Sequence, residues 1–218
     1  MTLEVRASVH RALSDPHRLR LVDSLVDSDR TPGELVDMTG MSSNLLAFHL
    51  KTLEAAGVVQ RHRSEGDARR RYVTLRHEIL PALPLVGENR RPRNVMFVCT
   101  HNSARSQFAE AAWRQVGGSE AWSAGTSPAE RVHPLAIDAA RAFGVDLTDR
   151  RPKGLDAVPP RVDVVVSVCD RALESGLPPS GLSFHWSVPD PMDGGLEAFS
   201  SAFTDIAARV DRLRSRLR

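Results

Sequence analysis

The stretch VMFVCTHNSARSQFAEAAW, residues 95–113, decides the fold of the second part of this chain. Its first residues are apolar and predict a buried strand that ends at Cys99. A loop of five residues follows, and Arg105 stands at the mouth of a segment rich in alanine and glutamate, which predicts a helix from about Ser106. A buried strand that leads through a short loop into a helix is typical of α/β proteins with a parallel sheet.

The residues of this loop suit the binding of a tetrahedral oxyanion beside a cysteine nucleophile. Backbone N–H groups of a strand-to-helix loop can point to a common centre, and the helix N-terminus adds partial positive charge. Arg105 offers a planar fork for two oxygens, the same fields stabilise a thiolate at Cys99, and the Ser106 hydroxyl can donate to that sulfur. The residues expected around the anion are Thr100, His101, Asn102, Ser103, Ala104 and Arg105.

A plainer interpretation stays open on these residues alone. Cys99 could be a buried cysteine at the end of a strand and Arg105 a solvated helix residue, because a cysteine six residues before an arginine is a weak signal. The context of apolar strand, polar loop and helix favours the functional interpretation.

The rest of the second segment alternates strands with helices. Apolar or β-branched runs predict strands at 121–125 and 162–169, and amphipathic patterns predict helices at 133–143 and 199–217. This order predicts an α/β domain with a doubly wound, mostly parallel sheet.

The N-terminal segment has a different pattern, helical and then strand-like. Helical spacing of apolar residues, together with Pro16, Pro32, Gly40 and Gly57 as helix boundaries, predicts four helices. They are expected at 5–13, 18–26, from Thr31-Pro32 to Gly40, and from a cap at Ser42, Ser43 or Asn44 to Gly57. Two strands, 58–63 and 70–75, joined by a hairpin tip at 64–67, complete a winged helix-turn-helix pattern.

Prolines, a glycine and several arginines interrupt both periodicities near residues 81–93. We therefore predict a winged-helix domain at 1–80, a linker at 81–93 and an enzyme domain at 94–218. The net charge of +2 argues against a protein that coats polyanions along its whole length. No apolar run approaches a membrane span, no signal peptide is recognisable, and two cysteines make no disulfide framework, so we expect a cytoplasmic protein.

The loop CTHNSARS, residues 99–106, resembles the phosphate-binding loop of low-molecular-weight protein tyrosine phosphatases and of the arsenate reductases that share their fold. SAGT (123–126), His133-Pro134, VDVVVSVC (162–169) and HWSVPDP (185–191) resemble further family signatures, so the resemblance covers residues 94–218. It implies that Asp190, rather than Asp193, is the general acid.

Several features resemble the reductases more than the phosphatases. RSQFAE lacks the proline that phosphatases usually place after Arg-Ser, HW precedes the acid loop, and Met192 stands where phosphatases tend to carry an aromatic residue. The resemblance implies a cysteine-dependent reduction of arsenate to arsenite, with phosphatase activity as the alternative.

The reductases coupled to thioredoxin carry a third cysteine beyond the position of Cys169, and this chain has none. Either Cys169 resolves the adduct or a small thiol does, and Cys169 could also be a buried apolar residue. We expect no bound cofactor and an external thiol reductant, mycothiol with a glutaredoxin-like partner or a thioredoxin system. Asn102, Glu110 and Ser123 sit where some reductases bind a cation, but the acidic fourth ligand has no match, so no metal is predicted.

Residues 5–76 resemble the ArsR-like winged-helix repressors. The resemblance implies operator DNA as a partner and a homodimer, although residues 1–93 lack the cysteines of arsenite-sensing members. The leading hypothesis is a repressor fused to an arsenate reductase; the alternatives are a phosphatase with a DNA-binding module and a non-catalytic regulator that senses oxyanion or arsenite. The residues expected at DNA are Ser42, Ser43, Asn44, Ala47, His49 and Lys51 on the recognition helix, and Arg61, Arg63, Arg69, Arg70 and Arg71 on the wing.

Overall fold

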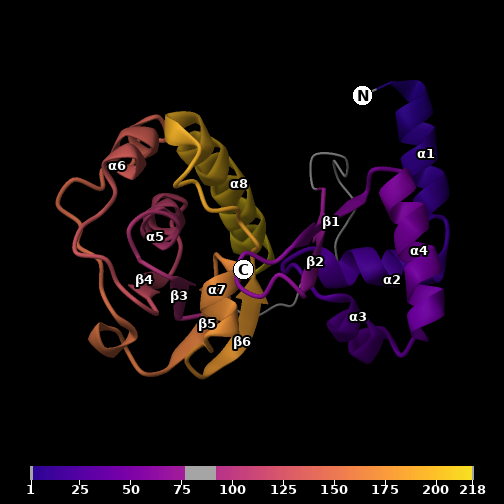
Figure 1. The fold of residues 1–218 in the computed structure, drawn as a ribbon, viewed down its shortest axis with the longest axis horizontal. Coiled ribbons are helices and arrows are strands. Elements are labelled where there is room, and N and C mark those ends of the chain that lie inside the picture. The colour runs from indigo at the N-terminus through magenta and orange to yellow at the C-terminus, as the bar shows by residue number, and fades with distance from the viewer. Residues whose placement is uncertain (1, 77–91, 218) are drawn as a thin grey trace. The chain divides into compact units, whose positions relative to one another are not determined.

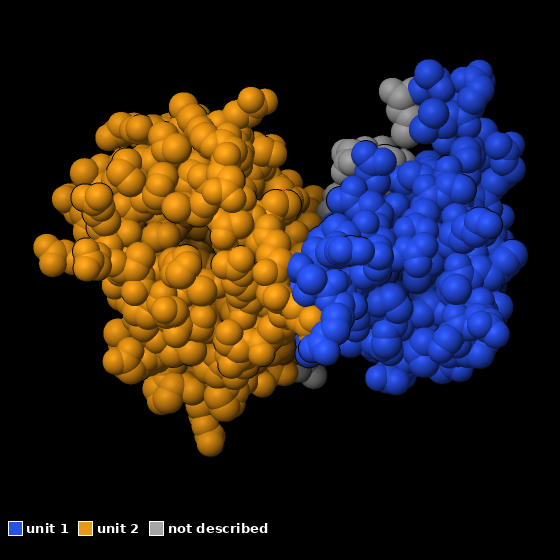
Figure 2. Space-filling model, in the orientation of Figure 1, with its two compact units in different colours: residues 1–64, 68–86 blue, residues 65–67, 87–218 orange. Residues whose placement is uncertain are grey.

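A computed structural model describes residues 2–76 and 92–217 of the chain. The chain folds as two compact units, one of residues 1–64 and 68–86 and the other of residues 65–67 and 87–218 (Figure 2). Most of the predicted linker, residues 81–91, lies outside the described residues, so the exact boundaries 1–80, 81–93 and 94–218 remain predictions.

The first unit is a set of four helices followed by a two-stranded hairpin. Asp15 caps the second helix with Pro16 in its first turn, Thr31 and Glu34 form a capping box on the third, and Ser42 caps the fourth. Gly40 ends the third helix at φ 70°, a conformation that glycine adopts without strain. The elements are α1 (Leu3–Leu13), α2 (Pro16–Leu25), α3 (Pro32–Thr39), α4 (Ser43–Ala55), β1 (Val59–Arg63) and β2 (Arg71–Leu75).

One apolar core holds this unit together. Leu21, Leu35 and Leu53 are fully buried, and Val73 of β2 packs in the same cluster. The hairpin strands are antiparallel, and Arg30 forms an isolated bridge to Val73 that ties the segment before α3 to the hairpin. The predicted winged helix-turn-helix is confirmed.

The second unit is a four-stranded parallel sheet with helices (Figure 1). The strand order is β4-β3-β5-β6, and each neighbouring pair is parallel. Helix α5 packs against β3, β4 and α8, while α7 packs against β3 and β5. The elements are β3 (Asn94–Cys99), α5 (Arg105–Gln115), β4 (Glu120–Gly125), α6 (Pro134–Arg141), the short helix η2 (Leu155–Ala157), β5 (Val162–Ser167), α7 (Asp170–Glu174), β6 (Ser180–His185) and α8 (Gly195–Arg216).

The central strands are buried because their residues are almost all apolar. Residues 95–98 of β3 are fully buried, and aromatic rings fill the layer between the sheet and the helices. Phe108 of α5 stacks on Phe203 of α8 with ring centroids 4.1 Å apart. The predicted doubly wound α/β fold is confirmed, whereas β6 and α7 were not predicted.

Parallel pairing brings the carboxyl ends of β3 and β5 to one edge of the sheet. Val98 of β3 is paired with Ser167 of β5. Cys99 directly follows the first of these residues and Cys169 comes two residues after the second, so both cysteines lie at the same edge of the sheet. Functional side chains at this edge can converge on one ligand. Within the described residues, no helix combines the length and the apolar character that a membrane crossing requires.

Candidate active site

Cys99 is the last residue of β3, and its side chain is buried at the start of the loop. The N–H of Asn102 donates to the Cys99 Sγ at 3.1 Å, and the Ser106 Oγ lies 3.0 Å from the same sulfur. A backbone N–H therefore donates to the sulfur, and a hydroxyl that can donate to a thiolate lies beside it.

Asn102 fixes the shape of the loop. It has φ 48°, the one positive value outside glycine among the described residues, and its side chain is fully buried. Its Nδ2 donates to the Ser106 Oγ at 2.8 Å, and its Oδ1 accepts from Gln107 Nε2 at 3.0 Å and from the Lys153 N–H at 2.8 Å. Asparagine tolerates this left-handed conformation better than most residues, and three hydrogen bonds hold it there.

Four carbonyl groups of the loop bind one neighbouring segment. The carbonyls of Cys99, Thr100, His101 and Ser103 accept N–H groups of residues 126, 127, 129 and 133. Because a trans peptide places the next N–H opposite its carbonyl, the N–H groups of residues 100, 101, 102 and 104 point away from that segment. The Asn102 N–H does point to the Cys99 sulfur. This arrangement provides an inward set of amides for an anion.

Gly125, the last residue of β4, permits the close approach of the loop. A Cβ there would lie 2.7 Å from the Thr100 carbonyl oxygen and 3.0 Å from the Asn102 nitrogen. Any side chain at this position of SAGT would collide with the loop, so the position requires glycine.

Arg105 is buried at the first turn of α5, which rules out the solvated alternative. Its Nη1 donates to the Val188 carbonyl at 2.7 Å, and its Nη2 lies 3.2 Å from the Asp190 Oδ2. Burial alone would lower the pKa of Arg105, but the charges of Cys169, Asp190 and Cys99 outweigh it and raise that pKa. The guanidinium is a fixed cation at the edge where both cysteines lie.

Asp190 is half-buried beside Arg105, whereas Asp193 is exposed. Asp190 accepts the Met192 N–H at 3.3 Å, which orients its carboxyl group. Its place at the arginine suits a group that exchanges a proton with a bound anion.

Cys169 is buried directly before α7, and its Sγ lies 3.4 Å from the Thr100 Oγ1. Burial raises the pKa of this thiol, while Arg105 opposes the change. Cys169 thus lies next to the loop, where the positive charge of Arg105 acts on its sulfur. Neither Cys99 nor Cys169 is in a disulfide.

A buried network behind Cys169 was not predicted from the sequence. His185 Nε2 lies 3.1 Å from the Asp170 Oδ1, Ser187 donates to the same oxygen, and Ser167 Oγ lies 2.8 Å from His185 Nδ1. Burial opposes ionisation of Asp170, but the bonds from His185 and Ser187 lower its pKa. The network joins the start of α7 to β5 and β6 and so fixes the backbone beside Cys169.

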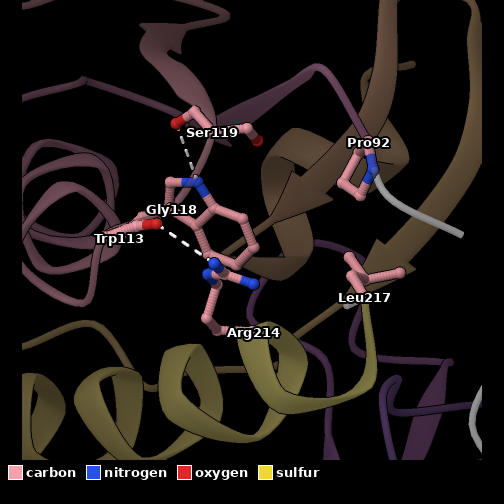
Figure 3. Close-up of a pocket in the computed structure, with 7 residues that line it drawn as sticks. Pro92, Trp113, Gly118, Ser119, Arg214 and Leu217 are labelled. Carbon is pink, nitrogen blue, oxygen red and sulfur yellow. Dashed lines mark hydrogen bonds between the residues drawn. The ribbon is translucent and has the colours of Figure 1, made fainter.

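A separate hollow of about 520 Å³ lies at the amino ends of β3 and β4, away from Cys99 (Figure 3). Trp113 Nε1 donates to the Ser119 carbonyl at 3.1 Å, and Arg214 Nη2 donates to the Gly117 carbonyl at 3.1 Å. Neither Cys99 nor Arg105 lines it, so it is separate from the site around the nucleophile loop. Among residues 2–76 and 92–217, no three His, Cys, Asp or Glu side chains are placed to hold a metal ion.

The surface of the first unit carries most of the residues expected at DNA. On α4 and its cap, the exposed side chains are Ser42, Ser43, Asn44, Ala47 and Lys51, and on the hairpin they are Arg61, Arg63, Arg69, Arg70 and Arg71. His49 was expected at DNA, but its side chain is buried, 4% exposed, with its ring centroid 5.4 Å from that of His17. Its place three residues after Leu46 and four before Leu53 puts it on the buried face. Arg61 also pairs with Glu54, which engages part of its charge.

Two family models match the chain. The model described as low molecular weight phosphotyrosine protein phosphatase matches residues 94–218, more than half of the chain. The chain belongs to the low molecular weight phosphotyrosine protein phosphatase family. A second model, bacterial regulatory protein of the arsR family, matches residues 15–61, which include α2, α3 and α4.

Among relatives of this phosphatase-family chain are proteins named arsenate reductase. "Arsenate reductase 2" of Staphylococcus epidermidis (strain ATCC 35984) is 30% identical over 129 residues, 57% of this chain and 98% of that protein. "Arsenate reductase" of Bacillus cereus (strain Q1) is 34% identical over 125 residues, 55% of this chain and 92% of that protein.

Solved structures agree on the fold of the second unit. A structure described as an arsenate reductase in the phosphate binding state is 30% identical, with a TM-score of 0.53, over 58% of this chain and 99% of that one. The tyrosine phosphatase Wzb from Escherichia coli K30, at 20% identity and a TM-score of 0.51, covers 58% of this chain and 99% of its own. The second likeness concerns the fold alone.

Proposed function

We propose that the second unit reduces arsenate to arsenite and that the first unit binds operator DNA. The observation that carries the enzymatic part is the pair of donors on the Cys99 sulfur, 3.1 and 3.0 Å away, beside a buried arginine. A sulfur in this setting is held as the nucleophile for a bound tetrahedral anion.

In the first step the Cys99 sulfur attacks arsenic, and an S–As bond forms. One arsenate oxygen leaves as hydroxide, takes a proton from Asp190 and departs as water. The N–H groups of residues 100, 101 and 104 and the Arg105 fork hold the other oxygens through this step. Arsenic remains As(V) in the adduct.

In the second step a second thiol attacks the Cys99 sulfur of the adduct as its thiolate, and its proton goes to an oxygen of the departing arsenite. An S–S bond forms, the S–As bond breaks, and its electron pair stays on arsenic, which leaves as arsenite, As(III). Cys169 is the proposed attacking thiol because it lies at the same sheet edge, 3.4 Å from the Thr100 hydroxyl. An external thiol then reduces the Cys99–Cys169 disulfide.

The external reductant is proposed to be mycothiol with a glutaredoxin-like partner, or a thioredoxin system, in the reducing cytoplasm. Arsenite production is measured with each donor for the wild type and for Cys169→Ala. If Cys169 resolves the adduct, the variant loses turnover with thioredoxin. If a small thiol attacks the adduct directly, Cys169→Ala keeps turnover with mycothiol and overturns the role given to Cys169.

The phosphatase alternative is tested on the same preparation. Arsenite formation from arsenate is compared with hydrolysis of p-nitrophenyl phosphate. We expect turnover of arsenate, and exposed Met192 offers no aromatic wall for an aryl ester. Efficient hydrolysis without arsenite formation would replace the reductase proposal with the phosphatase.

The DNA-binding proposal rests on the arsR-family match and on the exposed polar residues that begin α4. Selection from a random duplex library should yield a pseudo-palindrome, bound by a homodimer. Asn44→Ala should lower affinity for the selected site by roughly 10-fold or more, as loss of one base contact does. A library that yields no enriched sequence contradicts the proposal.

A further inference from the structure

Glu110 is a buried carboxylate on α5, outside the catalytic residues described above. It is 3% exposed, and the Ser123 hydroxyl donates to its Oε2 at 2.7 Å. Arg114 Nη2 lies 3.1 Å from Oε1, and Arg150 Nη1 lies 3.0 Å from Oε2. A buried carboxylate needs such partners, because removal from water without them is costly.

Two of the cationic partners of Glu110, Arg150 and Lys153, belong to a segment that also contacts the nucleophile loop. Lys153 Nζ lies 3.9 Å from the Glu110 Oε2, while its backbone N–H donates to the Asn102 Oδ1 at 2.8 Å. The Lys153 carbonyl accepts the Gly125 N–H at 2.8 Å. Through Lys153, the charge pairs at Glu110 are connected to the residue whose N–H faces Cys99.

Gln107 makes a second connection to the same segment. Its Nε2 donates to the Arg151 carbonyl at 2.9 Å and to the Asn102 Oδ1 at 3.0 Å. A shift of residues 150–153 would therefore remove the Lys153 N–H from the Asn102 Oδ1 and the Arg151 carbonyl from Gln107. Both bonds help to keep Asn102 in its left-handed conformation.

The arrangement does not fit the cation that some reductases bind at the positions of Asn102, Glu110 and Ser123. A metal ion needs free oxygen lone pairs. Here the Asn102 oxygen accepts two N–H groups, the Ser123 hydroxyl donates to Glu110, and both Glu110 oxygens face arginine or lysine nitrogens. An added cation would also meet the charges of these side chains at short range.

We propose that Arg150 and Lys153 are positioning residues that take the place of a bound cation. Their positive side chains pair with the Glu110 carboxylate and thereby fix residues 150–153. That segment in turn binds Asn102, whose N–H donates to Cys99. The reactivity of Cys99 is then independent of alkali metal ions. The proposal concerns the nucleophile itself and holds whether Cys99 reduces arsenate or cleaves a phosphoester.

The test measures the rate of alkylation of the Cys99 peptide by iodoacetamide, read by mass spectrometry in the full-length protein. KCl, NaCl and choline chloride are compared at equal ionic strength. The wild type should react at the same rate within twofold in all three salts. A rate several-fold higher in KCl or NaCl than in choline chloride overturns the proposal.

Variants test the role of the side chains in choline chloride. Arg150→Met combined with Lys153→Met should slow alkylation of Cys99 about 10-fold or more, the scale expected when a hydrogen bond to a charged group is lost. Arg151→Met is the matched control, because that arginine is exposed and only its carbonyl contacts the network. It should react as the wild type does.

Arg150→Lys guards against a variant that simply fails to fold. It keeps the charge and should keep at least half of the wild-type rate, whereas Arg150→Met should not. A double variant that alkylates at the wild-type rate contradicts the proposal. Equal losses in Arg150→Lys and Arg150→Met also contradict it, since packing rather than charge would then be responsible.

Discussion

Ser106→Ala removes the side-chain hydroxyl next to the proposed nucleophile and, with it, the acceptor of the Asn102 Nδ2. Ser106 is fully buried, and its Oγ lies 3.0 Å from the Cys99 Sγ. The same oxygen accepts from Asn102 Nδ2 at 2.8 Å, so the hydroxyl hydrogen is available to the sulfur. Alanine fits the first turn of α5 and favours the helix.

The expected loss follows from the charge of the sulfur. A hydrogen bond to a charged group contributes about 1.5–3 kcal/mol, and its loss slows a reaction of that group about 10–100-fold. The change in the free energy of unfolding should be smaller, about 1–2 kcal/mol, for one buried polar atom left without its partner. In free energy, the loss of activity should therefore exceed the loss of stability.

The assay pairs kcat/KM for arsenate with the rate of iodoacetamide alkylation at Cys99. Ser200→Ala is the matched control, since Ser200 is a serine of α8 whose hydroxyl bonds to the Leu196 carbonyl. We expect both rates to fall in Ser106→Ala and neither in Ser200→Ala. Wild-type rates in Ser106→Ala would refute the claim that its hydroxyl stabilises the thiolate.

Three further predictions concern the remaining parts of the account. Arg105→Lys keeps a charge but loses the fork, so phosphate should protect Cys99 from alkylation about 10–100-fold less well; equal protection contradicts a bidentate role. Burial raises the pKa of the Cys169 thiol in the folded protein. The stability that the protonated thiol contributes is therefore complete below its pKa in the unfolded chain, about 8.5, and is lost as the pH rises through its pKa in the folded protein. The Cys169 peptide should therefore be alkylated more slowly than that of Cys99 at pH 7 and accelerate only in alkaline solution, and equal rates would count against it. Leu50→Ala, at a fully buried position, should cost about 2–5 kcal/mol of unfolding free energy. Leu45 lies on the same helix and is 39% exposed, so Leu45→Ala should cost about 0.5 kcal/mol of unfolding free energy or less. If urea denaturation gives equal losses for the two variants, the buried face of α4 is assigned wrongly.

The nucleophile loop could be predicted from the sequence because its determinants are local. Cys99, Asn102 and Arg105 lie within seven consecutive residues, and their strand, loop and helix follow from short-range patterns. The same holds for the start of α2 at Pro16 and for Ser42, one of the three candidate caps of α4, both of which the structure confirms.

The elements that sequence reasoning missed have weak local signals. Helix α7 has five residues, too few for a helical period, and β6 mixes serine and glycine with its apolar residues. The pairing of Asp170 with His185 joins the first residue of α7 to the last residue of β6, and no periodicity reveals it. Likewise, Glu110 and Lys153 meet only after the chain folds.

The burial of His49 could have been foreseen. Leu46, Leu50 and Leu53 mark the buried face of α4, and His49 shares it by helical spacing. The motif resemblance favoured a DNA contact, but periodicity is the stronger guide to which side of a helix a residue occupies.

Arsenite formation in a single turnover tests the central claim most directly. Wild type and Cys99→Ala are mixed in excess over arsenate with a reducing thiol, and arsenite is measured with time. The account predicts stoichiometric arsenite from the wild type and none above the thiol-only background from Cys99→Ala. Equal arsenite from both proteins would contradict the assignment of Cys99 as the nucleophile.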